Sequence, residues 1–383
     1  MSEPVEKNGM SGGAQNGPEG GNILTKRVGL NRLSRIMVGD EGPPWARYAV
    51  LGGILAIALV LPYVVGSDRW VTLLTIVLIY VVLSSGLNIV VGFTGLLDLG
   101  YAAFYAIGGY FTAIVFVQLL RNRYGVDIDG LWWLFWVNLL LGGLLAAVAG
   151  ILIGYPTLRL RGDYLAIMTL AFHEIIRIVS NNWVGLTRGP SGISGVPSPE
   201  IGSFSLGGSF RLYYLALGIA VVTLFLIGRL VRSRIGRAWT AIREDEVAAE
   251  AMGIHTSRYK LLSYASGAFF AGVMGVFLAH YLNFIHPSKF KLMESFVILC
   301  LVVLGGMGSL AGPVAGAVIW ISVQEWLRDF EFIQTHPEVR GMAMGAILVL
   351  LMVFRPQGIF GGRHISLQMR LRSRHRAGKG EEA

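Results

Sequence analysis

The chain has 383 residues, of which 54% are hydrophobic and only 14% are charged. Soluble globular chains carry about 25% charged residues, so a water-surfaced globule of this length is excluded. The single cysteine, Cys300, excludes an internal disulfide framework and a multi-cysteine metal cluster. In a soluble chain the net charge of +9 would suggest nucleic acid binding, but in an apolar chain it indicates membrane topology. We therefore expect a membrane lipid environment and no nucleic acid partner.

Uncharged stretches recur along the chain, and a span of the hydrocarbon core needs about 20 residues. The candidate spans are residues 48–66, 70–97, 99–120, 131–158, 164–182, 212–228, 261–284, 295–324 and 341–354. A glycine run divides 295–324 into two short spans joined by a tight turn. The pattern predicts an all-α integral membrane protein with about ten transmembrane helices, some of them broken by glycine.

The basic residues predict the orientation of these spans. If both termini lie in the cytoplasm, 22 of the 32 Lys and Arg residues face it and nine face the opposite side. This excess on one side favours an even number of spans with both ends inside. Residues 1–46, polar and rich in glycine, are expected to form a disordered cytoplasmic extension, residues 47–356 the transmembrane domain, and residues 357–383 a basic cytoplasmic tail. The tail either contacts anionic lipid or acts only as a topological anchor.

Helix-breaking residues interrupt two apolar segments, residues 92–101 and 305–312. We expect both breaks at membrane depth, where transporters place broken backbone beside the solute pathway. Close helix packing also selects glycine, and this is the role expected for Gly108-Gly109 and Gly142-Gly143. The candidate pathway or gate residues are Gly95, Asp98, Tyr101, Glu174, Arg177, Gly306 and Gly308.

The charged side chains in the apolar segments are the strongest of these candidates. Asp98 either caps the helix expected to begin near Tyr101 or faces the pathway, because a carboxylate in such a stretch must meet a cavity, an interface or a partner. Glu174 and Arg177 stand near the far end of the fifth span, where they form a structural ion pair or act as a gate. His173 has no second histidine at the zinc-protease spacing, so no metal site is expected.

A long loop at residues 183–211 is expected on the outer side. Its glycines and prolines favour turns and exclude a regular helix. Ordered loops often carry binding function, so this loop is a candidate docking site for an external partner. The candidate contacts are Trp183, Gly189, Pro190 and Gly192.

The one large cytoplasmic loop, residues 229–260, predicts a short helix over residues 244–253. Three acids stand in its first turn, where the helix dipole favours them, and Gly253 follows as a C-terminal cap. A helix of about ten residues is unstable alone and needs a docking surface. Its alanine-rich face is expected to enter a cleft on another protein. The candidate docking residues are Arg243, Glu244, Asp245, Glu246, Ala248, Ala249, Glu250 and Gly253.

This helix resembles the coupling helix of ATP-binding-cassette (ABC) importer permeases. Further strings resemble the LivM-type permeases of branched-chain amino acid importers, within the LivH/LivM superfamily. They lie at residues 95–100, 161–170, 174–177, 181–183, 189–193, 236–238 and 305–313, and the resemblance covers roughly residues 48–362. It departs at Glu246-Val247-Ala248-Ala249, which stands where the family begins its loop with Glu-Ala-Ala. The resemblance implies a non-enzymatic permease subunit in the bacterial inner membrane.

The resemblance also implies partners. They are a LivH-like second permease, two LivG/LivF-like ATPase subunits that bind ATP and magnesium, and a periplasmic binding protein that delivers leucine, isoleucine or valine. The sequence agrees, because it contains no GxxxxGK[ST] motif and no nucleotide cofactor is expected in this chain. Urea or short amides are the alternative substrates. An ion-coupled secondary transporter, with Asp98 and Glu174 as ion sites, is a further alternative, and no catalytic constellation supports a membrane enzyme.

Overall fold

The computed structural model describes residues 44–125, 132–157, 162–201, 204–205 and 207–328, with isolated positions 341–342, 345–346, 349 and 358–359. The chain divides into two compact units at Ile57 and Ala58, and the second unit contains the packed helices and the candidate site. Three predictions lie wholly or largely outside the described residues: the extension 1–46, the last span 341–354 and the tail 357–383.

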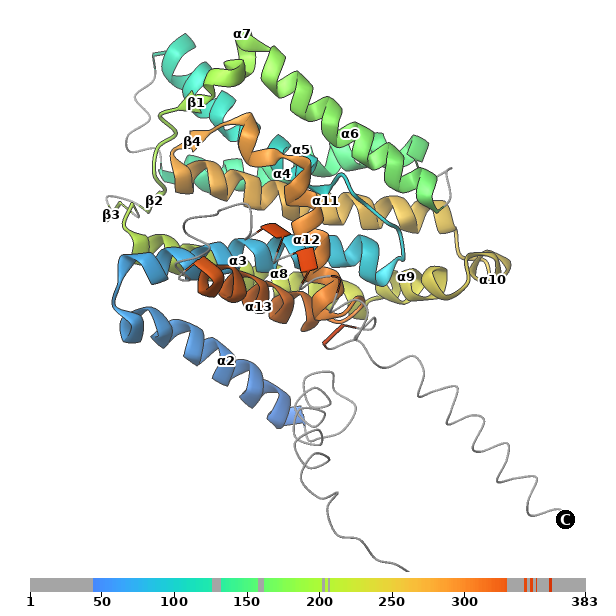
Figure 1. Cartoon of the computed structure of the whole chain (residues 1–383). Coiled ribbons are helices and arrows are strands. Elements are labelled where there is room, and N and C mark those ends of the chain that lie inside the picture. Colours follow the sequence, from blue (N-terminus) through green and yellow to red (C-terminus); the bar gives the residue numbers. More distant parts are fainter. Residues whose placement is uncertain are drawn as a thin grey trace, which may run out of the picture. The chain divides into compact units, whose positions relative to one another are not determined.

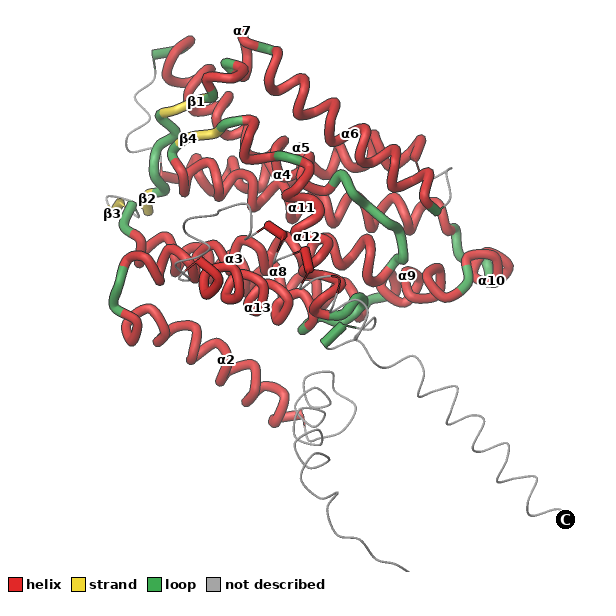
Figure 2. The backbone as a smooth tube through the Cα atoms, viewed as in Figure 1, coloured by secondary structure: helices red, strands yellow, loops and turns green. Residues whose placement is uncertain are grey.

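Helices form almost all of the described chain (Figures 1 and 2). The long helices are α2 (Pro44–Val65), α3 (Asp68–Asn88), α4 (Tyr101–Ala113), α5 (Trp132–Thr157), α6 (Asp163–Asn182), α8 (Ser209–Arg232), α11 (Thr256–Leu282), α12 (Leu292–Gly305) and α13 (Gly312–Arg328). The short helices are α7 (Val184–Thr187), α9 (Arg234–Glu244) and α10 (Glu246–Ala251). Two π-helical segments, Ile89–Phe93 and Ile114–Arg123, extend α3 and α4.

Five of the described helices are long and apolar enough to cross a membrane: Asp68–Phe93, Tyr101–Arg123, Trp133–Thr157, Ser209–Arg232 and Thr256–Leu282. Gly52–Val64 and Leu292–Gly305 are apolar but shorter. Helix α6 is not among these seven, because His173, Glu174 and Arg177 lower its apolarity. A mostly helical membrane protein is thus confirmed, whereas a count of ten spans is not established by the described residues.

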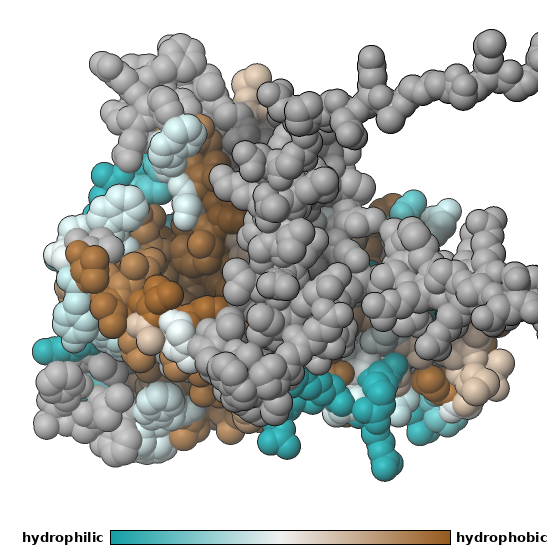
Figure 3. All heavy atoms as spheres, turned by 90° about the horizontal axis from the view of Figure 1, so that it is seen from below, coloured by the Kyte–Doolittle hydropathy of each residue, from teal (hydrophilic) through white to brown (hydrophobic). Residues whose placement is uncertain are grey.

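The outward surfaces of these helices are apolar, as a lipid environment requires. Figure 3 shows one face of the molecule, where apolar residues form a wide brown area and hydrophilic residues lie toward its margins. Helix α5 contributes exposed Leu140, Leu144 and Leu152, and α8 contributes exposed Val222 and Phe225. In water such a surface would promote aggregation, whereas in a membrane an apolar surface is favourable because it contacts hydrocarbon.

The first glycine break lies between two long helices, as the predicted spans 70–97 and 99–120 imply. Residues 94–100 join two helical segments of 26 and 23 residues, each about 35–39 Å long and therefore longer than the hydrocarbon core. The second break behaves as predicted, because residues 306–311 are a tight turn between the short helices α12 and α13.

Glycine allows α11 to contact both α4 and α5 backbone to backbone. A methyl group on Gly108 of α4 would lie 2.1 Å from the Gly272 carbonyl oxygen of α11. On Gly275 it would lie 2.2 Å from the Tyr105 carbonyl oxygen. On Gly142 of α5 it would lie 2.3 Å from the Val276 side chain. The predicted packing role of the glycines at 108 and 142 is confirmed, as is usual where membrane helices associate through small residues.

Four strands of two residues each add to the helices: β1 (Ile193–Ser194), β2 (Glu200–Ile201), β3 (Phe204–Ser205) and β4 (Phe284–Ile285). Strand β1 pairs antiparallel with β4, with Ile193 opposite Ile285, and these short strands appear in yellow in Figure 2. The loop at 183–211 is thereby tied to the end of α11. It also contains the single helical turn α7, which is too short to be the regular helix that its glycines and prolines were expected to exclude.

We predict that Gly108→Ala lowers the free energy of unfolding by about 1–3 kcal/mol, the usual cost of overpacking. The added methyl group would meet backbone rather than a movable side chain. Gly218→Ala in α8 is the matched control, because no heavy atom lies within 4 Å of its added Cβ. Thermal unfolding of both variants in detergent checks this, and equal midpoints would contradict the packing account.

Candidate functional site

The short helices α9 and α10 form the loop between α8 and α11. Ser233 caps α9, accepting a hydrogen bond from the Ile235 amide at 3.1 Å. Asp245 separates the two helices and caps α10, accepting from the amides of Val247 and Ala248, both at 2.9 Å. Gly253 ends the unit with φ +83°. The predicted cap glycine is therefore confirmed, and the predicted single helix is corrected: Glu244 closes α9, and α10 has six residues.

The exposed side of α10 also differs from the prediction. Ala249 is buried, with 5% of its surface exposed, whereas Val247 is 69% and Met252 is 84% exposed. The Lys260 ammonium of α11 lies 2.5 Å from the Glu246 carboxylate and fixes the start of α10. A partner that approaches α10 meets apolar side chains flanking Ala248, because Ala249 faces the chain's own interior.

Arg243, in the last turn of α9, contacts both glycine breaks. Its guanidinium Nη1 donates a hydrogen bond to the carbonyl oxygen of Gly92. A side chain at Gly95 would meet the Arg243 Cγ at 3.1 Å, and one at Gly308 would meet Nη1 at 2.3 Å. Gly95 and Gly308 also have φ values of +76° and +78°, which side chains disfavour. Both positions therefore require glycine for space and for backbone conformation.

Asn88, the last residue of α3, binds the second break. Its side-chain nitrogen donates to the Ser309 carbonyl at 2.8 Å, and its side-chain oxygen accepts from the Gly308 amide at 3.0 Å. We call residues 92–100 the first glycine turn and residues 305–312 the second glycine turn, which includes Gly306 at φ +112°. Arg243 therefore connects both turns to α9, and Asn88 holds the second turn against the end of α3.

Asp98 is buried within the first glycine turn, with 1% of its surface exposed. Its carboxylate accepts from the Gly100 amide at 2.8 Å, just before α4 begins, and burial raises the pKa of this carboxyl to about 6. The cap on α4 itself comes from elsewhere, because the Ala102 amide donates to the Ser295 hydroxyl of α12 at 3.0 Å. Asp98 therefore orders the turn instead of capping the helix.

Tyr101 is fully buried and does not face an open pathway. Its hydroxyl donates to the Gly267 carbonyl of α11 at 2.9 Å. In this conformation it holds α4 against α11.

Glu174 and Arg177 form the predicted ion pair on one face of α6. The Arg177 Nε donates to both Glu174 carboxylate oxygens, at 3.0 and 2.9 Å. Glu174 lies about 16 Å from the start of α6 at Asp163, and Arg177 lies about 8 Å from its end at Asn182. The pair is therefore in the second half of the helix, toward the end at which it was predicted.

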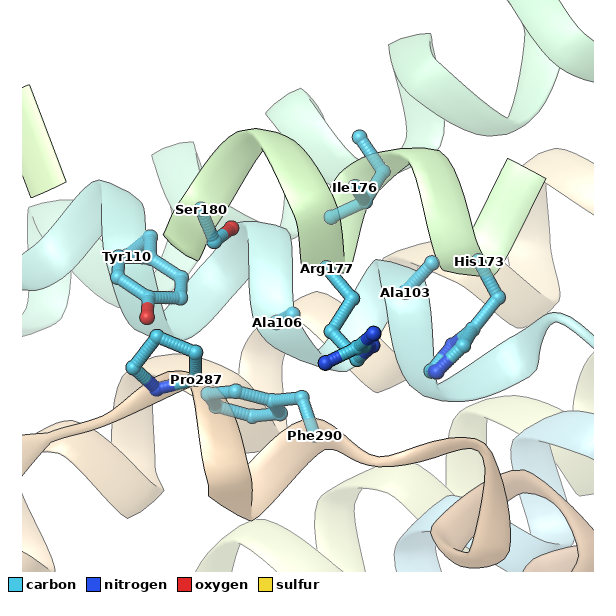
Figure 4. Close-up of a pocket in the computed structure, with 9 residues that line it drawn as sticks. All are labelled: Ala103, Ala106, Tyr110, His173, Ile176, Arg177, Ser180, Pro287 and Phe290. Carbon is cyan, nitrogen blue, oxygen red and sulfur yellow. The ribbon is translucent and has the colours of Figure 1, made fainter. Parts of the chain in front are cut away.

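A shallow recess lies beside this pair, between α6, α4 and the 3₁₀ turn Pro287–Phe290. Figure 4 shows Arg177 and His173 projecting from α6 toward Phe290, with Ala103 and Ala106 of α4 behind them. The recess is too narrow to hold a water molecule. Among the described residues, no group of three or more histidine, cysteine or carboxylate side chains is placed to hold a metal ion.

The loop 183–211 is anchored at several points. The His286 ring Nε2 donates to the Pro190 carbonyl at 2.8 Å, and the His280 ring Nδ1 donates to the Pro197 carbonyl at 2.7 Å. Gly189 and Gly192 have φ values of +53° and +66° and make its turns. Trp183 is 56% exposed, so the anchored loop presents an aromatic side chain on its surface.

Sequence reasoning missed Asn88, Ser295 and Thr169, whose hydroxyl accepts from the Leu99 amide at 3.1 Å. The one available signal was their polarity within apolar segments, since polar side chains in membrane helices bond across helices. Nothing in the sequence identifies their partners.

The chain is similar in sequence to known transport permeases. Residues 70–352 match the family model described as "Branched-chain amino acid transport system / permease component". The chain is 39% identical over 371 residues to the high-affinity branched-chain amino acid transport system permease protein LivM of Escherichia coli (strain K12), covering 91% of this chain and 82% of that protein. LivM of Salmonella typhimurium is also 39% identical, over 347 residues, covering 85% and 77% of the two chains.

A second group of relatives is more distant. The permease protein LivH of Salmonella typhimurium is 28% identical over 291 residues, which cover 74% of this chain and 91% of that protein. No solved structure matches the chain.

We predict that Asn88→Ala destabilises the protein by about 2 kcal/mol, because it leaves the part-buried Gly308 amide and Ser309 carbonyl without this partner. Asn122→Ala is the control, since that amide bonds only weakly to Gln118, at 3.4 Å, on an exposed surface. Thermal unfolding in detergent measures both. A shift in the Asn88 variant no larger than in the control would show that this side chain does not hold the second glycine turn against the end of α3.

Proposed function

The chain belongs to the family of permease components of branched-chain amino acid transport systems, and we propose that it is the LivM-type membrane subunit of an ATP-driven importer. In this proposal it translocates leucine, isoleucine and valine across the bacterial inner membrane. The observation that carries the proposal is the connection from α10 through Arg243 to both glycine turns, which gives a surface helix a mechanical contact with the ends of α3 and α12.

The proposed complex contains a second permease of the LivH type. The similarity of this chain to LivH proteins along most of their length supports two related permeases that pack together. Two ATPase subunits of the LivG/LivF type bind ATP and magnesium and hydrolyse the ATP, because this sequence has no phosphate-binding lysine motif. This subunit itself has no enzymatic role in the proposal.

The ATPase subunits dock on α10 from the cytoplasm. The loop that carries α9 and α10 has seven basic residues between positions 229 and 260, which supports its cytoplasmic side by the positive-inside rule. Both termini then lie in the cytoplasm as well. The opposite end, where β1 pairs with β4, faces the periplasm and receives the substrate-binding protein on the loop with Trp183, Gly189, Pro190 and Gly192.

Transport follows from the same contacts. Closure of the ATPase dimer displaces α10, and the capped junction at Asp245 passes this movement to α9. Trp239 ties α9 to α11 through a hydrogen bond from its ring nitrogen to the Tyr259 carbonyl at 2.7 Å, whereas Arg243 ties it to the glycine turns. Movement of α9 thus shifts the turns relative to α11, and the permeases alternate between inward and outward access.

We predict that Met252→Cys crosslinks to an ATPase subunit carrying a surface cysteine, in a Cys300→Ser background. Ala249→Cys is the matched control on the same short helix and should not crosslink, because Ala249 is buried. The products are detected by gel mobility of the assembled complex. Crosslinking at both positions, or at neither while the complex remains assembled, would contradict docking through the exposed side of α10.

We predict further that Arg243→Ala uncouples transport from hydrolysis. Leucine uptake into proteoliposomes should fall about tenfold, a change of about 1.4 kcal/mol, while ATP hydrolysis stimulated by the binding protein persists, because α10 still docks. Arg237→Ala on the same helix is the control, since Arg237 bonds only locally, to the Arg232 carbonyl at 3.2 Å. Equal uptake by the two variants would remove Arg243 from the coupling route.

A further inference from the structure

The Glu174–Arg177 pair is half-exposed on a helix that is otherwise apolar on that side. The Arg177 and Glu174 side chains are 38% and 39% exposed. The exposed residues around them repeat at helical spacing: Tyr164, Ile167, Met168, Ala171, Ile175, Ile178 and Val179. The pair lies in the second half of α6, at the border between this exposed apolar stripe and the side of the helix that packs against α4 and Phe290.

Lipid is a poor environment for such a pair. A charged side chain at the centre of a membrane helix costs about 2.5–3.5 kcal/mol on insertion scales. The other side of α6 is already occupied, since Leu165, Ala166 and His173 are buried within the chain. The pair consequently requires something other than hydrocarbon on its exposed side.

The chemistry of the pair matches an amino-acid zwitterion. Nε and Nη2 of Arg177 are engaged with the Glu174 carboxylate, and a guanidinium has five N–H donors while a carboxylate has about four acceptor sites. Both groups thus retain capacity for a second partner. An α-carboxylate fits the guanidinium, an α-ammonium fits the carboxylate, and the flanking Ile175 and Ile178 suit an aliphatic side chain.

We propose that the Glu174–Arg177 pair lines the translocation pathway and binds the α-ammonium and α-carboxylate groups of the amino acid in transit. This inference rests on the proposed function and deepens it, because it assigns a transit site to α6. The proposed site also favours amino acids over urea. A neutral amide carries no charge to pair with either group, whereas a zwitterion pairs with both the carboxylate and the guanidinium. The recess beside Arg177 (Figure 4) is too narrow to hold an amino acid, so the amino acid approaches the pair from the exposed stripe of α6.

Cysteine accessibility tests the location. Glu174→Cys is made in a Cys300→Ser background, in the full transporter reconstituted in proteoliposomes, and treated with a charged, membrane-impermeant methanethiosulfonate. Leu152→Cys on α5 is the control, because Leu152 is an apolar side chain that is 69% exposed. We expect the Glu174→Cys thiol to react and the Leu152→Cys thiol to remain unmodified. Leucine delivered by its binding protein during ATP turnover should slow the reaction at position 174 at least fivefold.

Two outcomes would overturn the proposal. A thiol at position 174 as inert as the one at position 152 would place the pair in lipid. A thiol at position 174 that reacts without protection by leucine, or crosslinks to the second permease, would make the stripe a subunit interface. If the unmodified transporter takes up no leucine at all, the proposed function itself fails, so that the two failures are distinguishable.

Uptake by charge-neutral variants gives a second test. Glu174→Gln and Arg177→Gln should each reduce leucine uptake at least tenfold, while ATP hydrolysis stimulated by the binding protein and the thermal unfolding midpoint stay near those of the unmodified complex. A merely structural ion pair would move the midpoint and leave uptake of the folded fraction intact. Uptake within twofold of the unmodified complex would overturn the proposal.

Discussion

The backbone contact of α11 with α4 and α5 is the constraint on which the rest of the structure depends. Gly108 and Gly275 leave no room for a methyl group between α4 and α11, and Gly272 leaves none between α11 and α5. In a membrane, where water cannot drive apolar side chains together, such close packing and interhelical hydrogen bonds supply the association. The Tyr101 hydroxyl and the Asn138–Thr112 bond, at 2.9 Å each, add those hydrogen bonds. These three helices form a fixed frame to which both loop regions are attached.

The two ends of this frame are arranged differently. At one end the loop 183–211 is bonded to the end of α11, through β1 and β4 and through His280. At the other end α11 carries Tyr259 and Lys260, which hold α9 and α10, while Arg243 reaches the glycine turns. One end thus presents an anchored loop surface, and the other presents the short helices α9 and α10, each begun by a capping side chain. This arrangement suits an importer, which receives solute on one side and a mechanical displacement from ATPase subunits on the other. The Glu174–Arg177 pair lies between these ends on α6.

Local features were predictable from the sequence, whereas contacts between distant residues were not. The spans, the packing glycines at 108 and 142, the cap at Gly253 and the i,i+3 pair at 174 and 177 follow from composition and helical spacing. The clamp at Asn88 depends on Gly308, 220 residues away, and no periodicity reveals such a partner.

The split of the predicted helix at Asp245 was missed because any of three consecutive acidic residues can begin a helix. The burial of Ala249 depends on how α10 lies against the rest of the chain, which its own six residues do not determine. The π-helical geometry at Ile89–Phe93 was not predicted, because composition does not distinguish a π-helix from an α-helix.

The central claim is that this chain forms an amino-acid pathway driven by ATPase partners. Its most direct test is uptake of labelled leucine into proteoliposomes that contain the two permeases and both ATPase subunits, with the binding protein on the opposite side from ATP. We expect ATP-dependent accumulation of leucine that is inhibited competitively by isoleucine and valine but not by urea. Accumulation should disappear when this chain is omitted. Leucine accumulation without this chain, or accumulation driven by an ion gradient in the absence of the ATPases, would contradict it.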